Sequence, residues 1–254
     1  MLCPSKSKLL SFSGLFSRER DNMQKLIVAV LLMVSVNGFA DEKYSAVISD
    51  IPPEIRTMMT GRTWHDKCPL GLEKLAYIRL SHWGFDDKPH VGELIVYKPL
   101  AEEVVTIFRE LYEIRFPIER MQLPERLPKG VSNSEANNTS AFYCRADEQV
   151  PTRFSSHSYG IAIDINDLYN PAVEGDQVDP EEGRKWLDRG LNHKGMIKEG
   201  DKLFTVFTNH GWRWGGFFRE VDYQHFGKVI TTHYQAERMR YIPPDMQIKS
   251  LGDF

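Results

Sequence analysis

The chain has 254 residues with 32 basic and 35 acidic side chains, and its net charge is −3 at neutral pH. This slightly acidic balance argues against a nucleic-acid partner, because binding to a phosphate backbone needs a clustered basic surface. The residues after the N-terminal segment are of a suitable number for one domain. A domain of this length can bury a hydrophobic core large enough to fold without disulfides or a structural metal.

The N-terminal segment is typical of a secretory signal. Met23–Lys25 gives a positive start, Leu26–Val34 is a short apolar run, and the small residues Gly38 and Ala40 follow before the chain turns acidic. We therefore predict a signal peptide over residues 23–40. The apolar run is shorter than the roughly 20 residues that span a bilayer, although an uncleaved N-terminal anchor is the alternative.

Residues 1–22 carry both signs of charge, so we predict that they are an upstream extension and that the true start is Met23. Removing residues 1–40 takes away five of the 32 basic and two of the 35 acidic side chains, which leaves 27 and 33 and a net charge near −6. We expect residues 41–254 to form a single periplasmic or secreted domain, a monomer without a membrane span. Its cysteines, Cys68 and Cys144, can form one disulfide or remain as buried thiols.

The first half of the predicted domain contains a strand pair and a helix. Residues 41–70 are broken by prolines and glycines, so we expect an irregular lead-in with at most a short helix. Lys74–Trp83 alternates like a half-buried strand, and Glu93–Tyr97 is a second strand candidate. Val104–Ile114 has apolar residues at helical spacing, and Pro117 ends the helix.

The second half is predicted to alternate short strands and helices after a polar loop at 124–138. Strands are expected at Gly160–Asn166, His210–Trp214 and Tyr223–Lys228. Helices are expected at Pro180–Arg189, with Asp179 as the N-cap, and at Lys198–Asn209. Strands interrupted by helices and tight turns predict an α+β fold, in which helices flank an antiparallel sheet.

Two short motifs combine imidazoles with carboxylates. Ser155–Asp164 reads Ser-Ser-His-Ser-Tyr-Gly-Ile-Ala-Ile-Asp and contains His157, whereas Asp222 and His225 stand three residues apart near the C-terminus. The carboxylate of Asp164 lies in an apolar strand, which is costly unless a cation or a partner compensates its charge. Two imidazoles and two carboxylates suffice for three zinc ligands and a base. The alternatives are a structural aspartate paired with an arginine, and a surface contact between the later pair.

In both motifs the sequence resembles the zinc D-Ala-D-Ala carboxypeptidases and dipeptidases, with their relatives the L-alanyl-D-glutamate endolysin peptidases. The family pattern Ser-x-His-x-x-Gly-x-Ala-x-Asp is matched by Ser155, His157, Gly160, Ala162 and Asp164. The second signature, Asp/Glu-x-x-His, is matched by Asp222 and His225. The resemblance covers roughly residues 75–230. It implies a hedgehog/DD-peptidase-like fold, one Zn²⁺ per chain, and hydrolysis of peptide bonds in the peptidoglycan stem peptide.

The resemblance also implies a role for each matched residue. His157, Asp164 and His225 are expected to be the metal ligands. Asp222 is expected to be the general base that deprotonates the attacking water and passes the proton to the leaving amine.

Three further residues receive roles from the resemblance or from their position near the motifs. Arg145 is expected to stabilise the oxyanion, with Arg153 as its rival and a structural salt bridge as the alternative. Ser155 is expected to contact the substrate or orient a ligand, or else to be a turn hydroxyl. Trp214 is expected to line the substrate cleft, and the alternative is an aromatic residue packed in the hydrophobic core.

Two departures from the family pattern affect specificity. Phe217 and Phe218 stand where relatives often carry a tryptophan, and the base is Asp222 where the dipeptidases have glutamate. The second departure favours a carboxypeptidase or an endopeptidase over a strict dipeptidase. Two other functions stay open: a non-catalytic zinc-containing module that binds cell wall or protein on the same fold, and a non-haem iron oxygenase with a two-histidine, one-carboxylate triad.

Overall fold

The structure is a computed structural model that describes residues 43–147 and 153–230. The contacts divide the chain into Met1–Lys43 and Tyr44–Phe254, and every helix and strand of the described residues belongs to the second unit. The predicted signal peptide over residues 23–40 lies outside the described residues. Within those residues, no helix has the length and apolar composition that crossing a bilayer requires.

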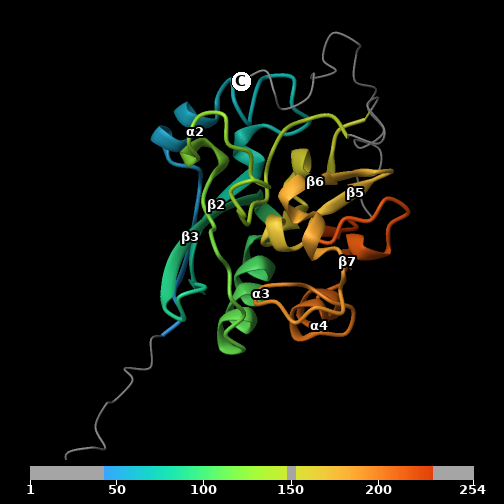
Figure 1. The fold of residues 1–254 in the computed structure, drawn as a ribbon. Coiled ribbons are helices and arrows are strands. Elements are labelled where there is room, and N and C mark those ends of the chain that lie inside the picture. Colours follow the sequence, from blue (N-terminus) through green and yellow to red (C-terminus); the bar gives the residue numbers. More distant parts are fainter. Residues whose placement is uncertain (1–42, 148–152, 231–254) are drawn as a thin grey trace, which may run out of the picture. The chain divides into compact units, whose positions relative to one another are not determined.

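Three antiparallel strands form the first sheet, in the order β1 (Ala46–Ser49), β2 (Leu75–Trp83) and β3 (Pro89–Tyr97) (Figure 1). The two predicted strands are therefore present, but β3 begins earlier than expected because the pairing with β2 continues as far as Trp83 opposite Pro89. The lead-in contains the short helix that the prediction allowed, α2 (Pro53–Met59), but also the strand β1, which was not predicted.

Helix α3 (Ala101–Glu113) packs against β2. Its predicted apolar stripe is confirmed, because Val104, Ile107, Phe108 and Leu111 are all buried in the hydrophobic core. These side chains recur at helical spacing, so one face of the helix closes the core while the glutamates on the other faces stay in contact with water.

The second sheet has the order β4 (Ala162–Asp164), β8 (His225–Lys228) and β7 (Trp212–Trp214), with both pairs antiparallel. Helix α4 (Lys202–Asn209) packs beside β7. This helix begins four residues later than predicted because the Asp201 carboxylate caps it, accepting the Phe204 N–H at 2.7 Å.

The segment 140–142 joins the two sheets. Ser140 and Asp164 exchange backbone hydrogen bonds of 3.0 and 2.9 Å, and the Phe142 N–H donates to the Ile95 carbonyl at 3.0 Å. This segment therefore ties β3 of the first sheet to β4 of the second. The predicted α+β fold with antiparallel sheets is confirmed.

The region after β4 differs from the prediction. β5 (Ala172–Glu174) and β6 (Gln177–Asp179) form a hairpin, and a 3-10 helix replaces the predicted α-helix that Asp179 was to cap. Asp179 instead accepts a hydrogen bond from the Ser134 hydroxyl at 2.9 Å. The hairpin turns at Gly175-Asp176, where Gly175 adopts φ +58°, and such a Gly-Asp pair is a hairpin signal.

Short 3-10 helices lie at Leu72–Lys74, Lys98–Leu100, Pro124–Arg126, Ser156–Tyr159, Asp167–Tyr169, Glu181–Trp186 and Gly215–Phe217. Cys68 and Cys144 form a disulfide with a Cα–Cα distance of 6.0 Å. The bond links the lead-in to the irregular segment that precedes the first motif. It resolves the choice between a bridge and two thiols that the sequence left open.

Candidate metal centre

His157 lies on the 3-10 turn Ser156–Tyr159, and the motif residues around it build that turn. The Ser155 hydroxyl oxygen accepts the His157 backbone N–H at 3.3 Å, which caps the turn. Gly160 ends it with φ +62°, and a Cβ at this position would stand 2.5 Å from the backbone nitrogen of Tyr97. Only glycine combines this conformation with so close an approach. The serine and glycine of the motif therefore position the histidine.

Asp164 and His225 are direct cross-strand partners in the antiparallel pair β4–β8. Their side chains consequently point to the same face at neighbouring positions. Ala162 shares that face of β4 and is fully buried, and its small side chain leaves space beside the carboxylate.

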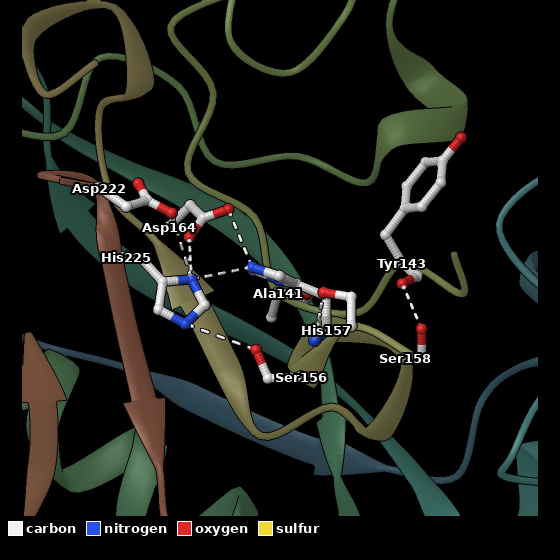
Figure 2. Close-up of polar contacts among 9 residues, drawn as sticks. Ala141, Tyr143, Ser156, His157, Ser158, Asp164, Asp222 and His225 are labelled. Atoms are coloured by element: carbon white, nitrogen blue, oxygen red, sulfur yellow. Dashed lines mark hydrogen bonds and ion pairs between the residues drawn. The ribbon is translucent and has the colours of Figure 1, made fainter. Parts of the chain in front are cut away.

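The three candidate ligands converge on one point (Figure 2). His157 Nε2 lies 3.1 Å from Asp164 Oδ2, and His225 Nδ1 lies 3.0 Å from Asp164 Oδ1. The two imidazole nitrogens, His157 Nε2 and His225 Nδ1, are 3.2 Å apart. Both histidines are buried. His225, more than 60 residues beyond His157 and Asp164 in the sequence, thus completes a compact triangle of donor atoms with them.

The outer partners of the two imidazoles determine which nitrogens face inward. His157 Nδ1 lies 2.5 Å from the Ala141 carbonyl oxygen, which can only accept, so Nδ1 carries the proton and Nε2 presents its lone pair. His225 Nε2 lies 3.4 Å from the Ser156 hydroxyl oxygen, which can accept a hydrogen bond from the Nε2–H, so that Nδ1 faces inward with its lone pair. Figure 2 shows both outer contacts.

This donor set fits a small divalent cation. Two nitrogen lone pairs and a carboxylate repel one another at 3.0–3.2 Å unless positive charge lies among them. Ligands at zinc bond lengths in a tetrahedron are separated by about 3.3 Å, close to the observed edges. Burial alone would raise the pKa of Asp164, but the charge and hydrogen bonds of His157 and His225 hold that pKa below its usual range.

Asp222 lies beside this triangle. Its Oδ2 is 3.9 Å from His225 Nδ1, and its backbone N–H donates to the Gly215 carbonyl at 3.0 Å. A Cβ on Gly215 would meet the Asp222 carbonyl oxygen at 2.3 Å and the His225 Cβ at 3.1 Å. The glycine therefore allows both side chains to approach from the same turn.

Sequence reasoning missed a third carboxyl group near the centre. Asp167 is only 2 % exposed, and burial, followed by the charges of Asp164 and Asp222, raises the pKa of its carboxyl well above the usual value. In the amide orientation that satisfies its hydrogen bonds, the Gln224 nitrogen lies 3.1 and 3.3 Å from the two Asp167 oxygens. The sequence did offer a signal for this residue, since Asp167 directly follows the predicted apolar strand Gly160–Asn166.

The two arginines that precede the first motif occupy different environments. Arg145 pairs through its backbone with the turn that carries His157, since its N–H donates to the Ser158 hydroxyl and its carbonyl accepts the Ser155 N–H. Arg153, the rival for the same role, forms an ion pair with Asp147 at 2.9 Å. The choice between Arg145 and Arg153 as the oxyanion-binding arginine stays a prediction.

The aromatic residues near His225 divide into buried and exposed groups. Trp214 is 4 % exposed, and its indole N–H donates to the Tyr223 carbonyl at 2.8 Å, so it packs beneath the turn that carries Asp222. Phe217 and Phe218 are 59 % and 41 % exposed, and the Phe218 ring centre lies 5.8 Å from that of His225. The placement of Trp214 favours packing, and its substrate-binding role stays a prediction.

A second group of possible ligands among the described residues consists of His65, Cys68 and Cys144. The two sulfurs are joined in the disulfide, so they cannot act as thiolate ligands. The triangle of His157, Asp164 and His225 is therefore the candidate metal centre.

Comparison with known proteins agrees with this placement. Residues 149–228 match the family model described as D-alanyl-D-alanine carboxypeptidase, and this segment contains the three candidate ligands and Asp222. The match supports the resemblance of this segment to the zinc D-Ala-D-Ala carboxypeptidases. No curated protein and no solved structure matches the chain.

Proposed function

We propose that this chain is a zinc-dependent peptidase that hydrolyses peptide bonds of the peptidoglycan stem peptide, as a D-Ala-D-Ala carboxypeptidase or an L-Ala-D-Glu endopeptidase. The observation that carries this proposal is the convergence of His157, Asp164 and His225 with donor atoms 3.0–3.2 Å apart. The peptidase family match supports the reaction class. Three protein ligands of this kind, with a fourth position left open, are the usual set of a catalytic zinc.

Zinc held by these side chains would polarise a carbonyl and lower the pKa of a water molecule to about 7. Asp222 then serves as the general base, since its carboxylate stands beside the His225 ligand without belonging to the triangle. It accepts the proton of the attacking water and delivers it to the leaving amine. A pure binding module has no need of such a base, so the position of Asp222 favours an enzyme.

The remaining residues of the site bind the substrate or position the metal ligands. We assign Arg145 to the developing oxyanion, because its backbone is fixed to the turn that carries His157. Ser155 orients His157 through the cap of that turn. The exposed ring of Phe218 offers an apolar wall beside the centre for a small side chain such as the methyl group of alanine.

We place this activity outside the cytoplasm, on the basis of the signal peptide predicted over residues 23–40 and a single domain over residues 41–254. Stem peptides of the cell wall are found there. The predicted export and the proposed substrate therefore agree with each other.

Digestion of defined muropeptides tests the proposal. The purified protein is incubated with pentapeptide muropeptides, with and without a chelator, and the products are analysed by mass spectrometry. Loss of one terminal D-Ala identifies a carboxypeptidase, and a cut between L-Ala and D-Glu identifies an endopeptidase. Chelator must stop the reaction and added zinc must restore it. Absence of cleavage at both bonds in the zinc-loaded protein contradicts the proposal.

A further inference from the structure

A polar groove of about 560 Å³ lies on the first sheet, and none of the candidate metal ligands lines it. Its residues come from α2, from the strands β2 and β3, and from the segment 119–126. Binding sites for small molecules have volumes of about 300–1,000 Å³. The groove therefore has the size of a ligand site and is separate from the metal centre.

The strand register explains why charged residues gather there. Val47 pairs with Arg79 across β1–β2, and Arg79 pairs with Glu93 across β2–β3, so these three side chains form a row on one face of the sheet. The opposite face carries Ile78 and Leu80, which are 0 % and 1 % exposed and belong to the core. The row is thus the side of the sheet that faces the groove.

The floor of the groove is a fixed network around Glu93. Its carboxylate accepts a hydrogen bond from the Tyr77 hydroxyl and pairs with the Arg126 guanidinium, whose Nε lies 2.5 Å from Oε2. Tyr77 is buried, and only 15 % of the Glu93 side chain is exposed. Both oxygens of the Glu93 carboxylate therefore already have partners within the protein, and the carboxylate holds Arg126 in place at the edge of the groove.

Two more arginines line the groove, and their charges are available to a ligand. Arg79 and Arg120 are exposed, and within residues 43–147 and 153–230 neither guanidinium pairs with a carboxylate. A guanidinium binds carboxylates through two parallel hydrogen bonds. Arg79 and Arg120 together therefore provide two binding positions for free carboxylates.

The other lining residues restrict the class of ligand. Glu54 and Glu119 also line the groove, which suits an ammonium group and disfavours a polyphosphate. Val91, on the same face of β3 as Glu93, is 56 % exposed and offers an aliphatic contact. We propose that the arginine groove, defined by Tyr77, Arg79, Glu93, Arg120 and Arg126, is a second binding site for a short peptide with free carboxylates and an amine.

A binding experiment with a small probe tests this site apart from hydrolysis. The probe is the dipeptide γ-D-Glu-L-Lys, whose choice rests on the proposed function. It contains neither bond that the metal centre is proposed to cut, so its binding does not depend on that activity. Amide chemical-shift changes of the purified protein and isothermal titration calorimetry are measured together. We expect shifts in β2 and β3 around Arg79 and Glu93, and none around His157.

The variants Arg79→Gln and Arg120→Gln should each weaken binding about tenfold, because each removes one charge-assisted contact to a carboxylate. Both positions are exposed, and an unfolding curve verifies that each variant folds. Arg213→Gln, at an exposed position on β7, is the matched control and should bind the probe like the unchanged protein. The dipeptide with both carboxylates amidated should bind far more weakly.

Three results would overturn the inference. One is the absence of binding at millimolar probe, and another is equal affinity in the Arg79→Gln and Arg120→Gln variants and the unchanged protein. The third is equally tight binding of inorganic phosphate, which would make the groove a general anion site. Each of these results leaves the peptidase proposal untouched, since that proposal depends on cleavage at the metal centre.

Discussion

His157 Nδ1 lies 2.5 Å from the carbonyl oxygen of Ala141, a residue 16 positions upstream and outside both ligand motifs. This contact places the proton on the outer nitrogen of the imidazole and directs the inner lone pair toward Asp164 and His225. Ala141 belongs to the segment 140–142 that joins the two sheets. The same backbone connection therefore holds the fold together and sets the tautomer of a candidate ligand.

Replacement of Asp222 separates the base from the ligands. Asp222→Ala should lower kcat about 10²–10⁴-fold, because a positioned general base contributes about that factor, while the zinc content stays that of the unchanged protein. Cleavage of a muropeptide and zinc analysis of the same sample provide the two readings. Asp176→Ala, at an exposed acid in the β5–β6 turn, is the control and should change neither. Undiminished cleavage by Asp222→Ala would remove Asp222 from the mechanism.

Gly215→Ala should displace the turn that carries both Asp222 and His225, because the new Cβ would lie 2.3 Å from the Asp222 carbonyl oxygen. We expect a loss of about 1–3 kcal/mol in the free energy of unfolding, as for other overpacked sites, together with weaker zinc binding. Urea unfolding and a zinc titration measure the two effects. Gly190→Ala meets only the flexible Asp188 carboxylate and is the matched control. If both variants behave alike, the close approach at Gly215 is unimportant.

Phe218→Ala tests the apolar wall beside His225. The loss of a ring that contacts a small apolar substrate group should lower kcat/KM about tenfold, mainly through KM, because this contact is made in both the bound and the transition state. Steady-state kinetics on a stem peptide provide the measurement. Leu191→Ala, which removes another exposed apolar side chain, is the control. An unchanged KM in Phe218→Ala would show that the ring does not touch the substrate.

His82 should make the protein less stable in mild acid. Burial lowers the pKa of this histidine to about 4, whereas in the unfolded chain it is about 6.5. Between these values the unfolded state binds the proton more readily, so stability is full above about pH 6.5 and falls by up to about 3 kcal/mol as the pH drops to about 4. In His82→Gln this contribution is absent.

Urea unfolding of both proteins across this pH range gives the test. The stability difference between the unchanged protein and His82→Gln should shrink as the pH falls. The ring of His90 stacks on that of His82, and Asp86 pairs with His90, so both remain in place in the comparison. A stability difference that is constant with pH would contradict the low pKa of His82.

Periodicity predicted the elements whose pattern is local. The stripe of α3 is visible in the sequence because the helix buries one face regardless of its neighbours. The strand β2 was also predicted, but its expected half-buried alternation is wrong, since Arg79 is its only exposed residue. β1 was missed because its four residues pair with β2 from a distance. The β5–β6 hairpin was missed because each of its strands has only three residues, too few for an alternating pattern to stand out.

The same distinction applies to the candidate site. The motifs pointed to His157, Asp164 and His225 as the ligand set, and the structure brings these three together. The Ala141 carbonyl was invisible in the sequence, since any residue supplies a carbonyl and only the fold positions it. Asp167 was likewise missed, because its position after an apolar strand is a weak signal and its burial depends on the fold around it.

The zinc content of the purified protein tests the central claim most directly. Elemental analysis should find one zinc ion per chain in the unchanged protein and in Asp222→Ala. It should find essentially none in the ligand variants His157→Ala and His225→Ala, provided that both remain folded by circular dichroism. An unchanged protein without zinc after zinc loading, or folded ligand variants that retain it in full, would contradict the assignment of this triangle as the metal centre.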